Sequence, residues 1–291
     1  MITPLKDRGT LDVDGLERLV NRMIDGGVAG IFALGTTGEA PSLSYALRRE
    51  LVAQTCRIVN GRVPVLVGIT DTSLVESANF SRAVADIGAD AVVTSAPFYF
   101  PAGQPELLDY LKELLPELPL PLVLYNMPSL TKIVFHRNVV EWALDQESII
   151  GLKDSSGDLV YFRKMQRLAA ERRPDWRLLV GPEELLAETV LLGGHGGVNG
   201  GANLNPRLYV ELYEAAKAGD LPRTRELSAK VLALSESIYT VGQHGSAIIK
   251  GIKCALSVLG VCDDFMAAPF HRFEERERGL IASRLQALGI V

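Results

Sequence analysis

The segment IIGLKDSSG, residues 149–157, is a short apolar run that ends in Lys153 and then turns through an aspartate, two serines and a glycine. A short apolar run bounded by turn residues predicts a buried β-strand. Similar runs recur along the chain, and segments of helical period lie between them. Strands that alternate with helices in this way predict βαβ units and a parallel sheet.

The alternation can be followed through most of the chain. The predicted strands span residues 28–34, 63–68, 91–95, 120–125, 149–153, 177–180 and 195–199. The predicted helices between them span residues 16–24, 43–59, 74–87, 107–115, 138–144, 159–170 and 185–192. With Ile2–Thr3 the strands number eight, the number that closes an α/β (β/α)8 TIM barrel.

A doubly wound sheet is the competing architecture. It is less favoured, because no predicted strand is followed by a dinucleotide-binding fingerprint and the glycine-rich stretch 193–197 lacks the GxGxxG spacing. Beyond Asn205 the pattern is helical. We expect a barrel over residues 1–204, and the last barrel helix with a C-terminal helical extension over residues 205–291, in a single compact unit. Residues 1–5 leave almost no chain for the first strand, so either that strand is truncated or the native start lies upstream of Met1.

The composition is that of a soluble globular protein, with 47% hydrophobic and 22% charged residues in 291. A net charge of −5 disfavours nucleic acid or an anionic membrane as partner. No apolar run approaches the roughly 20 residues of a membrane helix, and no signal peptide is evident. Three cysteines without paired spacing favour a reducing, cytoplasmic setting, and no Cys/His cluster indicates a metal site.

The chemistry of a parallel barrel lies at the carboxyl ends of its strands. After the strand at 28–34, the turn Gly35-Thr36-Thr37-Gly38 has backbone N–H groups that can bind a small carboxylate. Alternatively, this turn only leads into the next helix, capped by Ser42 or Ser44. The aromatic stretch 97–101 follows the strand at 91–95 and suits either packing or a subunit contact.

Two further strand ends carry reactive side chains. Tyr125 ends the strand at 120–125, where a suitably hydrogen-bonded hydroxyl can shuttle protons. Lys153 ends the strand at 149–153 beside isoleucine and leucine, and burial there disfavours its charged form. A neutral lysine amine attacks a ketone carbonyl and forms a Schiff base. Either residue alone also has a structural interpretation, since a strand-end lysine usually extends its charge into solvent.

Together, the motifs GTTGE (35–39), YNMP (125–128) and GLKD (151–154) resemble those of the dihydrodipicolinate synthase / N-acetylneuraminate lyase family. The resemblance runs from Ile2 to beyond Pro269. It implies a (β/α)8 barrel with a C-terminal helical extension, a homotetramer built as a dimer of dimers, and class I aldolase chemistry on pyruvate or another 2-keto acid. It also implies that the partners are a small keto acid and an aldehyde.

The resemblance assigns roles to individual residues. Lys153 forms a covalent Schiff base with the keto acid, so no other cofactor and no metal is expected, and Tyr125 moves protons to and from it. Thr36 relays protons between Tyr125 and a Tyr99 supplied by the neighbouring subunit. The remaining residues are expected to contact substrate: Gly35, Thr37, Ser155, Glu183, Glu184 and Val198.

The second substrate divides the family. Dihydrodipicolinate synthases carry an arginine two residues past the proline of the tyrosine motif, where this chain has Leu130. A leucine cannot pair with the second carboxylate of that reaction. The stretch Gly181-Pro182-Glu183-Glu184 resembles an acidic segment of the sugar-acid lyases, although glutamates at this place also suit a helix N-terminus. Gly200 lies where sialic-acid lyases tend to have serine.

The favoured hypothesis is reversible cleavage of a 2-keto-3-deoxy sugar acid or an N-acetylneuraminate-like substrate to pyruvate and an aldehyde. The first alternative is dihydrodipicolinate (4-hydroxy-tetrahydrodipicolinate) synthase, which condenses pyruvate with aspartate semialdehyde. A sugar-acid dehydratase and a non-catalytic keto-acid binder complete the alternatives. His195, inside the last predicted strand, is interpreted as a structural residue.

Overall fold

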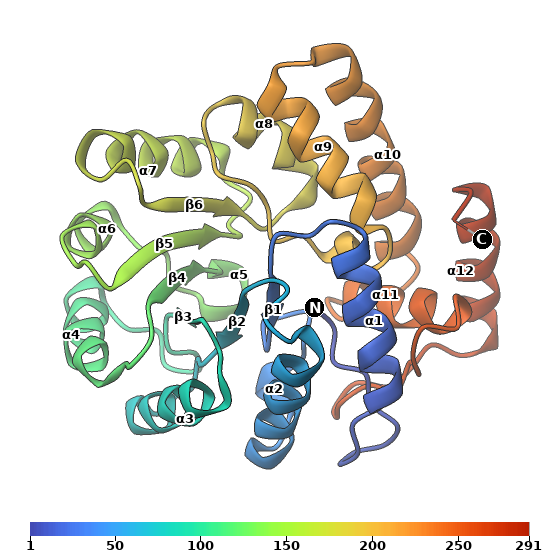
Figure 1. The fold of residues 1–291 in the computed structure, drawn as a ribbon, viewed down its shortest axis with the longest axis horizontal. Coiled ribbons are helices and arrows are strands. Elements are labelled where there is room, and N and C mark those ends of the chain that lie inside the picture. Colours follow the sequence, from blue (N-terminus) through green and yellow to red (C-terminus); the bar gives the residue numbers. More distant parts are fainter. Residues whose placement is uncertain (291) are drawn as a thin grey trace.

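The computed structural model describes residues 1–290, in which a curved parallel sheet is ringed by helices (Figure 1). Its six strands pair in sequence order, each with the next. They are β1 (Ile31–Ala33), β2 (Val65–Gly68), β3 (Ala91–Ser95), β4 (Leu122–Asn126), β5 (Ile149–Asp154) and β6 (Arg177–Val180). The fold is the expected (β/α)8 TIM barrel with C-terminal helices.

Helices follow the strands along the chain and pack around the outside of the sheet (Figure 1). Four of those in the barrel region begin at a residue whose side chain accepts a hydrogen bond from the first helical turn; Ser44 does this for Leu47. The helices of the barrel region are α1 (Val13–Asp25), α2 (Tyr45–Val59), α3 (Leu74–Ile87), α4 (Gln104–Leu114), α5 (Pro128–Thr131), α6 (Arg137–Leu144), α7 (Leu159–Arg172) and α8 (Leu186–Leu191).

The predicted strand at 195–199 is not a regular strand. His195 donates from its backbone N to Leu178 O (2.9 Å), and Val198 donates to Val180 O (2.8 Å), so the segment runs beside β6. Only Gly197 forms a bridge, to Val180. Gly196 has a φ of 134°, outside the range of a regular strand, so it interrupts the ladder.

Ile2–Thr3 does not form a regular strand either. The nitrogen of Met1 donates to Phe32 O (2.8 Å), which places this segment beside β1. On the other side, the backbone N of Ile2 donates to the side-chain Oδ1 of Asn203 (3.0 Å). Here the side chain of Asn203 accepts the hydrogen bond that the backbone of a neighbouring strand would accept in a regular sheet.

The two faces of the sheet bury different clusters. Leu122 and Leu124 are fully buried and pack in the large core between strands and helices. Val123 and Tyr125 point the other way and join Val93 in a smaller apolar cluster. Since successive strand residues face opposite sides, this alternation directs Tyr125 into the barrel.

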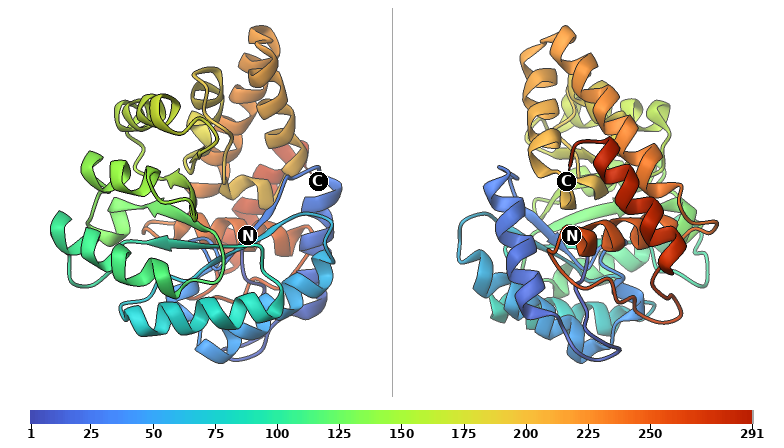
Figure 2. Two further views of the ribbon diagram at one scale, coloured as in Figure 1. Left: turned by 60° about the vertical axis from the view of Figure 1, so that its left-hand side comes forward. Right: turned by 90° about the vertical axis from the view of Figure 1, so that its right-hand side faces the viewer.

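Four helices form the C-terminal region: α9 (Pro206–Ala218), α10 (Leu221–Tyr239), α11 (Ala247–Val258) and α12 (Glu275–Ala287). They lie on one side of the barrel, near α1 (Figure 2). The first of them begins directly after the predicted boundary at residues 204/205. The last residue of the predicted extension, Val291, lies outside the described residues. Within residues 1–290, no helix combines the length and apolar character needed to cross a membrane.

Candidate active site

Tyr125 and Lys153 lie side by side at the carboxyl ends of β4 and β5. The parallel register pairs the two residues directly. The Lys153 Nζ lies 4.2 Å from the centre of the Tyr125 ring and 5.2 Å from that of Phe32. Both the lysine and the tyrosine are 7% exposed. An amine in this position is shielded by aromatic rings and lies within reach of a phenol that can transfer protons.

Asn126 and Asp154, the next residues on each strand, also pair. Asn126 Nδ2 donates to Asp154 Oδ1 (2.8 Å), and both residues are buried. The backbone N of Phe135 donates to Asn126 Oδ1 (3.2 Å), while Ser156 donates to the Asp154 carboxylate from its backbone N and its hydroxyl. These bonds fix the register that places Tyr125 beside Lys153. Neither Asn126 nor Asp154 is among the site residues predicted from the sequence.

Thr36 links a third strand end to this pair. Its hydroxyl lies 3.1 Å from the Tyr125 hydroxyl. Thr36 belongs to a tight turn after β1 in which Gly38 N donates to Gly35 O and Glu39 N donates to Thr36 O, each at 3.0 Å. The structure therefore brings Lys153, Tyr125 and Thr36 together, as expected. Half-buried Thr37 and Gly35 lie in the same turn.

The electrostatic surroundings of Tyr125 favour its ionised form. Burial alone raises the pKa of this phenol, but the Lys153 ammonium and hydrogen bonds from Thr36, Ser155 and Lys153 outweigh burial and lower the pKa below its ordinary value. A phenol with a lowered pKa exchanges its proton more readily near neutral pH, because its pKa is closer to the pH of the reaction. This shift supports the proton-shuttle assignment that the sequence motif suggested.

Ser155 lies against the phenol because the neighbouring segment leaves room for it. Its backbone N donates to Asn126 O (2.8 Å), which extends the pairing of β4 and β5 by one residue. A Cβ on Gly181 would lie only 1.8 Å from the Ser155 Oγ. Glycine is thus required at position 181 for Ser155 to face the site.

The two predicted acidic residues have different surroundings. Glu183 is 4% exposed, and its carboxylate accepts hydrogen bonds from the hydroxyls of Tyr209 and Tyr239 and from Gly201 N. Burial raises the pKa of Glu183. Because protein donors already occupy both of its oxygens, the geometry does not support Glu183 as an acceptor for substrate hydroxyls. Glu184 is exposed, so it keeps that capacity.

Tyr99 and Val198 complete the predicted set. Tyr99 is 84% exposed, has a φ of 83°, and stacks edge-on against the equally prominent Phe100 with ring centres 5.0 Å apart. Within one chain its ring is therefore presented outward. Val198 lies half-buried beside β6, to which its backbone is bonded.

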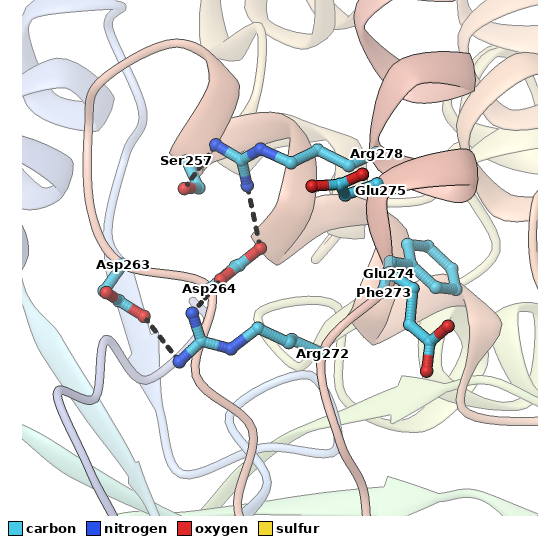
Figure 3. A pocket seen from close by; sticks show the side chains of 8 residues that line it. All are labelled: Ser257, Asp263, Asp264, Arg272, Phe273, Glu274, Glu275 and Arg278. Atoms are coloured by element: carbon cyan, nitrogen blue, oxygen red, sulfur yellow. Dashed lines mark hydrogen bonds and ion pairs between the residues drawn. The ribbon is translucent and has the colours of Figure 1, made fainter.

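A surface cavity of about 590 Å³ lies away from these strand ends, in the C-terminal region (Figure 3). Its two arginines pair with its two aspartates: Arg272 contacts Asp263 and Asp264, and Arg278 contacts Asp264 (Figure 3). The charges of Arg272 and Arg278 are therefore balanced by carboxylates of the same cavity. Over residues 1–290 no group of three or more His, Cys, Asp or Glu residues is arranged to hold a metal ion.

These strand-end groups occur on a chain that matches one known family over almost all its length. The dihydrodipicolinate synthetase family model covers residues 1–288. The chain belongs to this family. Its members are pyruvate-dependent lyases, and this protein is accordingly a carbon–carbon lyase of that class.

Individual members of the dihydrodipicolinate synthetase family differ in their described activities. A structure of dihydrodipicolinate synthase from Bacteroides thetaiotaomicron is 56% identical, with a TM-score of 0.96 over 99% of this chain and 96% of that one. The 4-hydroxy-tetrahydrodipicolinate synthase of Methanopyrus kandleri is 32% identical over 100% of this chain and 95% of its own length. A protein of Escherichia coli described as a probable 2-dehydro-3-deoxy-D-pentonate aldolase is also 32% identical, over 97% of this chain and 93% of its own.

These comparisons confirm the family resemblance carried by the three motifs. They support the synthase alternative better than the sugar-acid hypothesis that the sequence analysis favoured, because two of these three relatives carry the synthase name. The sequence preference for a sugar acid rests on Leu130 and on the acidic stretch 181–184, but the oxygens of Glu183 in that stretch are occupied by protein donors.

Proposed function

We propose that this protein is a 4-hydroxy-tetrahydrodipicolinate synthase that condenses pyruvate with aspartate semialdehyde through a Schiff base on Lys153. The observation that carries the chemistry is the grouping of buried Lys153 and Tyr125 with half-buried Thr36. The choice of aldehyde is supported by the 56% identity to the Bacteroides protein over 99% of this chain.

The reaction needs no group beyond the chain and its substrates. The neutral Lys153 amine adds to C2 of pyruvate, and loss of water leaves an iminium ion. The Tyr125 phenolate takes a proton from C3 and leaves an enamine, whose C3 attacks the aldehyde carbon. The new alkoxide takes a proton from Tyr125, which Thr36 holds through their hydroxyl contact. The amino group of the condensed semialdehyde then displaces Lys153 from the iminium carbon and closes the ring.

A second candidate is the reversible cleavage of a 2-keto-3-deoxy sugar acid, and the surroundings of Leu130 favour it. The two nearby cations are engaged elsewhere: Lys132 donates to Ser129 O (2.6 Å), and Arg137 pairs with Glu141 (2.8 Å). A substrate carboxylate would therefore compete with these existing contacts for either cation, whereas an arginine at position 130 would face no such competition. In this candidate Tyr125 takes the C4 hydroxyl proton, and the bond between C3 and C4 breaks to give an aldehyde and an enamine.

The assembly belongs to the same proposal. Tyr99 is exposed on each chain, and we propose that it reaches Thr36 of a second copy in a homotetramer. A cytoplasmic location fits the three unpaired thiols of Cys56, Cys254 and Cys262.

The deciding experiment traps the imine. The protein is incubated with pyruvate and borohydride, the intact mass is measured, and the modified peptide is mapped. A reduced pyruvyl adduct on Lys153, absent from Lys153→Ala, supports the mechanism. If folded wild-type protein gives no adduct, the Schiff-base proposal is wrong.

Turnover assays then separate the candidates. A reductase-coupled assay with pyruvate and aspartate semialdehyde tests the synthase, and pyruvate release from a panel of 2-keto-3-deoxy sugar acids tests the aldolase. A dehydratase would form a new keto acid from a sugar acid without releasing pyruvate. Adduct formation without turnover of any compound would indicate a keto-acid binder.

A further inference from the structure

A fully buried ion pair joins the barrel to the C-terminal helices. Lys253 of α11 and Glu39, which follows the turn after β1, both have fully buried side chains, and the Lys253 Nζ lies 2.6 Å from Glu39 Oε1. Lys253 also donates to Phe265 O (2.5 Å), and Ala267 N donates to Glu39 Oε2 (2.8 Å). Every charged atom of the pair therefore has a partner, as a buried pair requires.

The same glutamate closes the turn that carries Thr36. Glu39 N donates to Thr36 O (3.0 Å), and Ser42 N donates to Glu39 O (2.9 Å). Glu39 adopts a left-handed φ of 57°, a conformation that a residue with a Cβ keeps only when its surroundings hold it there. The ion pair with Lys253 and the bond from Ala267 supply that restraint from the C-terminal region.

A chain of contacts thus runs from the C-terminal helices to the reacting groups. It passes from Lys253 to Glu39, through the backbone bond of Glu39 to Thr36, and across the 3.1 Å hydroxyl contact to Tyr125. Thr3 braces the turn from the other side by donating to Gly38 O (2.7 Å). None of these contacts requires Glu39 or Lys253 to touch substrate.

We propose that Glu39 and Lys253 are positioning residues for catalysis: their buried ion pair sets the turn so that the Thr36 hydroxyl reaches Tyr125. This inference rests on the proposed function, because it assigns the pair its effect through the Thr36–Tyr125 contact. It also gives the C-terminal helices a direct part in the reaction geometry.

The test is a double-mutant cycle with a spectroscopic readout. Glu39→Gln keeps the size of the side chain but removes its charge, and Thr36→Val removes the hydroxyl that the pair is proposed to position. The two single variants and Glu39→Gln/Thr36→Val are compared with wild type for kcat and for the pH at which Tyr125 ionises, read from tyrosinate absorbance against Tyr125→Phe. Asp71→Asn is the matched control, because it removes a different buried ion pair, with Arg48 (3.5 Å).

We expect Glu39→Gln to lower kcat about 10- to 100-fold, the size of effect that a small misplacement produces. It should shift the Tyr125 ionisation to higher pH in the same direction as Thr36→Val. When Glu39→Gln is added to Thr36→Val, kcat should fall by less than about twofold relative to Thr36→Val alone, since the effects of residues in one network are not additive. Asp71→Asn should leave the Tyr125 ionisation unchanged.

Two results would overturn the inference. One is an equal loss of kcat from Glu39→Gln in the wild-type and Thr36→Val backgrounds. The other is a folded Glu39→Gln variant whose Tyr125 ionises at the same pH as in wild type. If Glu39→Gln does not fold, Glu39→Gln/Lys253→Met removes both charges together and replaces it in the cycle. The tyrosine titration needs no turnover, so it tests the positioning role even if the Lys153 adduct, and with it the proposed function, fails.

Discussion

Tyr125 and Lys153 occupy directly paired positions on adjacent parallel strands, with the lysine Nζ 4.2 Å from the centre of the phenol ring. The backbone register alone therefore brings a nucleophile and a proton carrier together. The proton chemistry depends on the further contact with Thr36, which leads to the first prediction.

Thr36→Val should raise the pKa of Tyr125. The Thr36 hydroxyl favours the phenolate, so without it the tyrosine ionises at higher pH. Turnover should fall about 100-fold, the lower range for loss of acid–base assistance. Tyrosinate absorbance and kcat measured against pH check both effects. Thr36→Ser keeps the hydroxyl and should titrate almost as wild type does; an equal shift in both variants would contradict the explanation.

Asn126→Leu should impair both stability and activity. It leaves Asp154 without its amide donor and Phe135 N without its acceptor, which costs about 1–3 kcal/mol in the free energy of unfolding. Loosening the register should also slow trapping of pyruvate on Lys153. Urea denaturation and the rate of adduct formation measure the two effects. Asp158→Ala, which removes the α7 cap, should cost about 1 kcal/mol while trapping stays normal.

Glu183→Gln should flatten the dependence of stability on pH. Burial raises the pKa of Glu183 in the folded protein, so the folded state holds its proton more tightly than the unfolded chain does. The stability from this group is complete below about pH 4.3, the ordinary glutamate pKa, and is lost as pH rises through the higher folded-state value. Tm measured from acid to alkaline pH should decline less in the variant. The exposed Glu184→Gln is the control, and parallel curves for wild type and Glu183→Gln would refute the prediction.

Leu130→Arg should distinguish the two candidate substrates. An arginine there could pair with the carboxylate of aspartate semialdehyde, and such a charge-assisted contact is worth about 1.5–3 kcal/mol, or roughly tenfold or more in kcat/KM. If the natural substrate is a sugar acid, synthase activity should appear or rise while sugar-acid cleavage falls. An unchanged kcat/KM for the semialdehyde would show that the enzyme binds its carboxylate elsewhere. Ser129→Arg, one residue away, serves as the control for added charge.

Tyr99 should act across a subunit interface. We expect the protein to sediment as a tetramer and Tyr99→Phe to lose most of its activity. Mixing Tyr99→Phe chains with Lys153→Ala chains should restore activity, because a mixed pair holds one site with an intact lysine and a tyrosine from its neighbour. Activity that stays low after subunit exchange, shown by mass, would place Tyr99 outside the partner's site.

The helices and most strands follow from sequence periodicity, and the differences have local causes. The strand predicted over residues 28–34 is observed only over Ile31–Ala33, and it ends there because Leu34 adopts a left-handed φ of 59°. The segment 195–199 has the composition of a buried strand, but its glycines permit an irregular backbone. Periodicity in the sequence indicates which face of an element is buried. The left-handed backbone conformation of a single residue depends instead on neighbours distant in sequence.

The candidate site divides in the same way. Lys153, Tyr125 and Thr36 could be predicted because parallel strand ends meet at one edge of the barrel. The surroundings of Glu183 could not, since its partners Tyr209 and Tyr239 belong to helices whose packing no local pattern specifies. A glutamate after a strand looks the same in sequence whether it faces substrate or two buried phenols.

Glu183 and Glu39 follow β6 and β1 respectively, and each is bonded to the C-terminal helices. The mouth of the barrel and those helices should consequently open as one cooperative unit, and their amides should exchange with deuterium at matching rates. Substitutions on α10 and α11 could then alter turnover without touching the reacting groups. For engineering, the C-terminal helices therefore offer positions at which the turnover of this enzyme can be altered without substitutions in its active site.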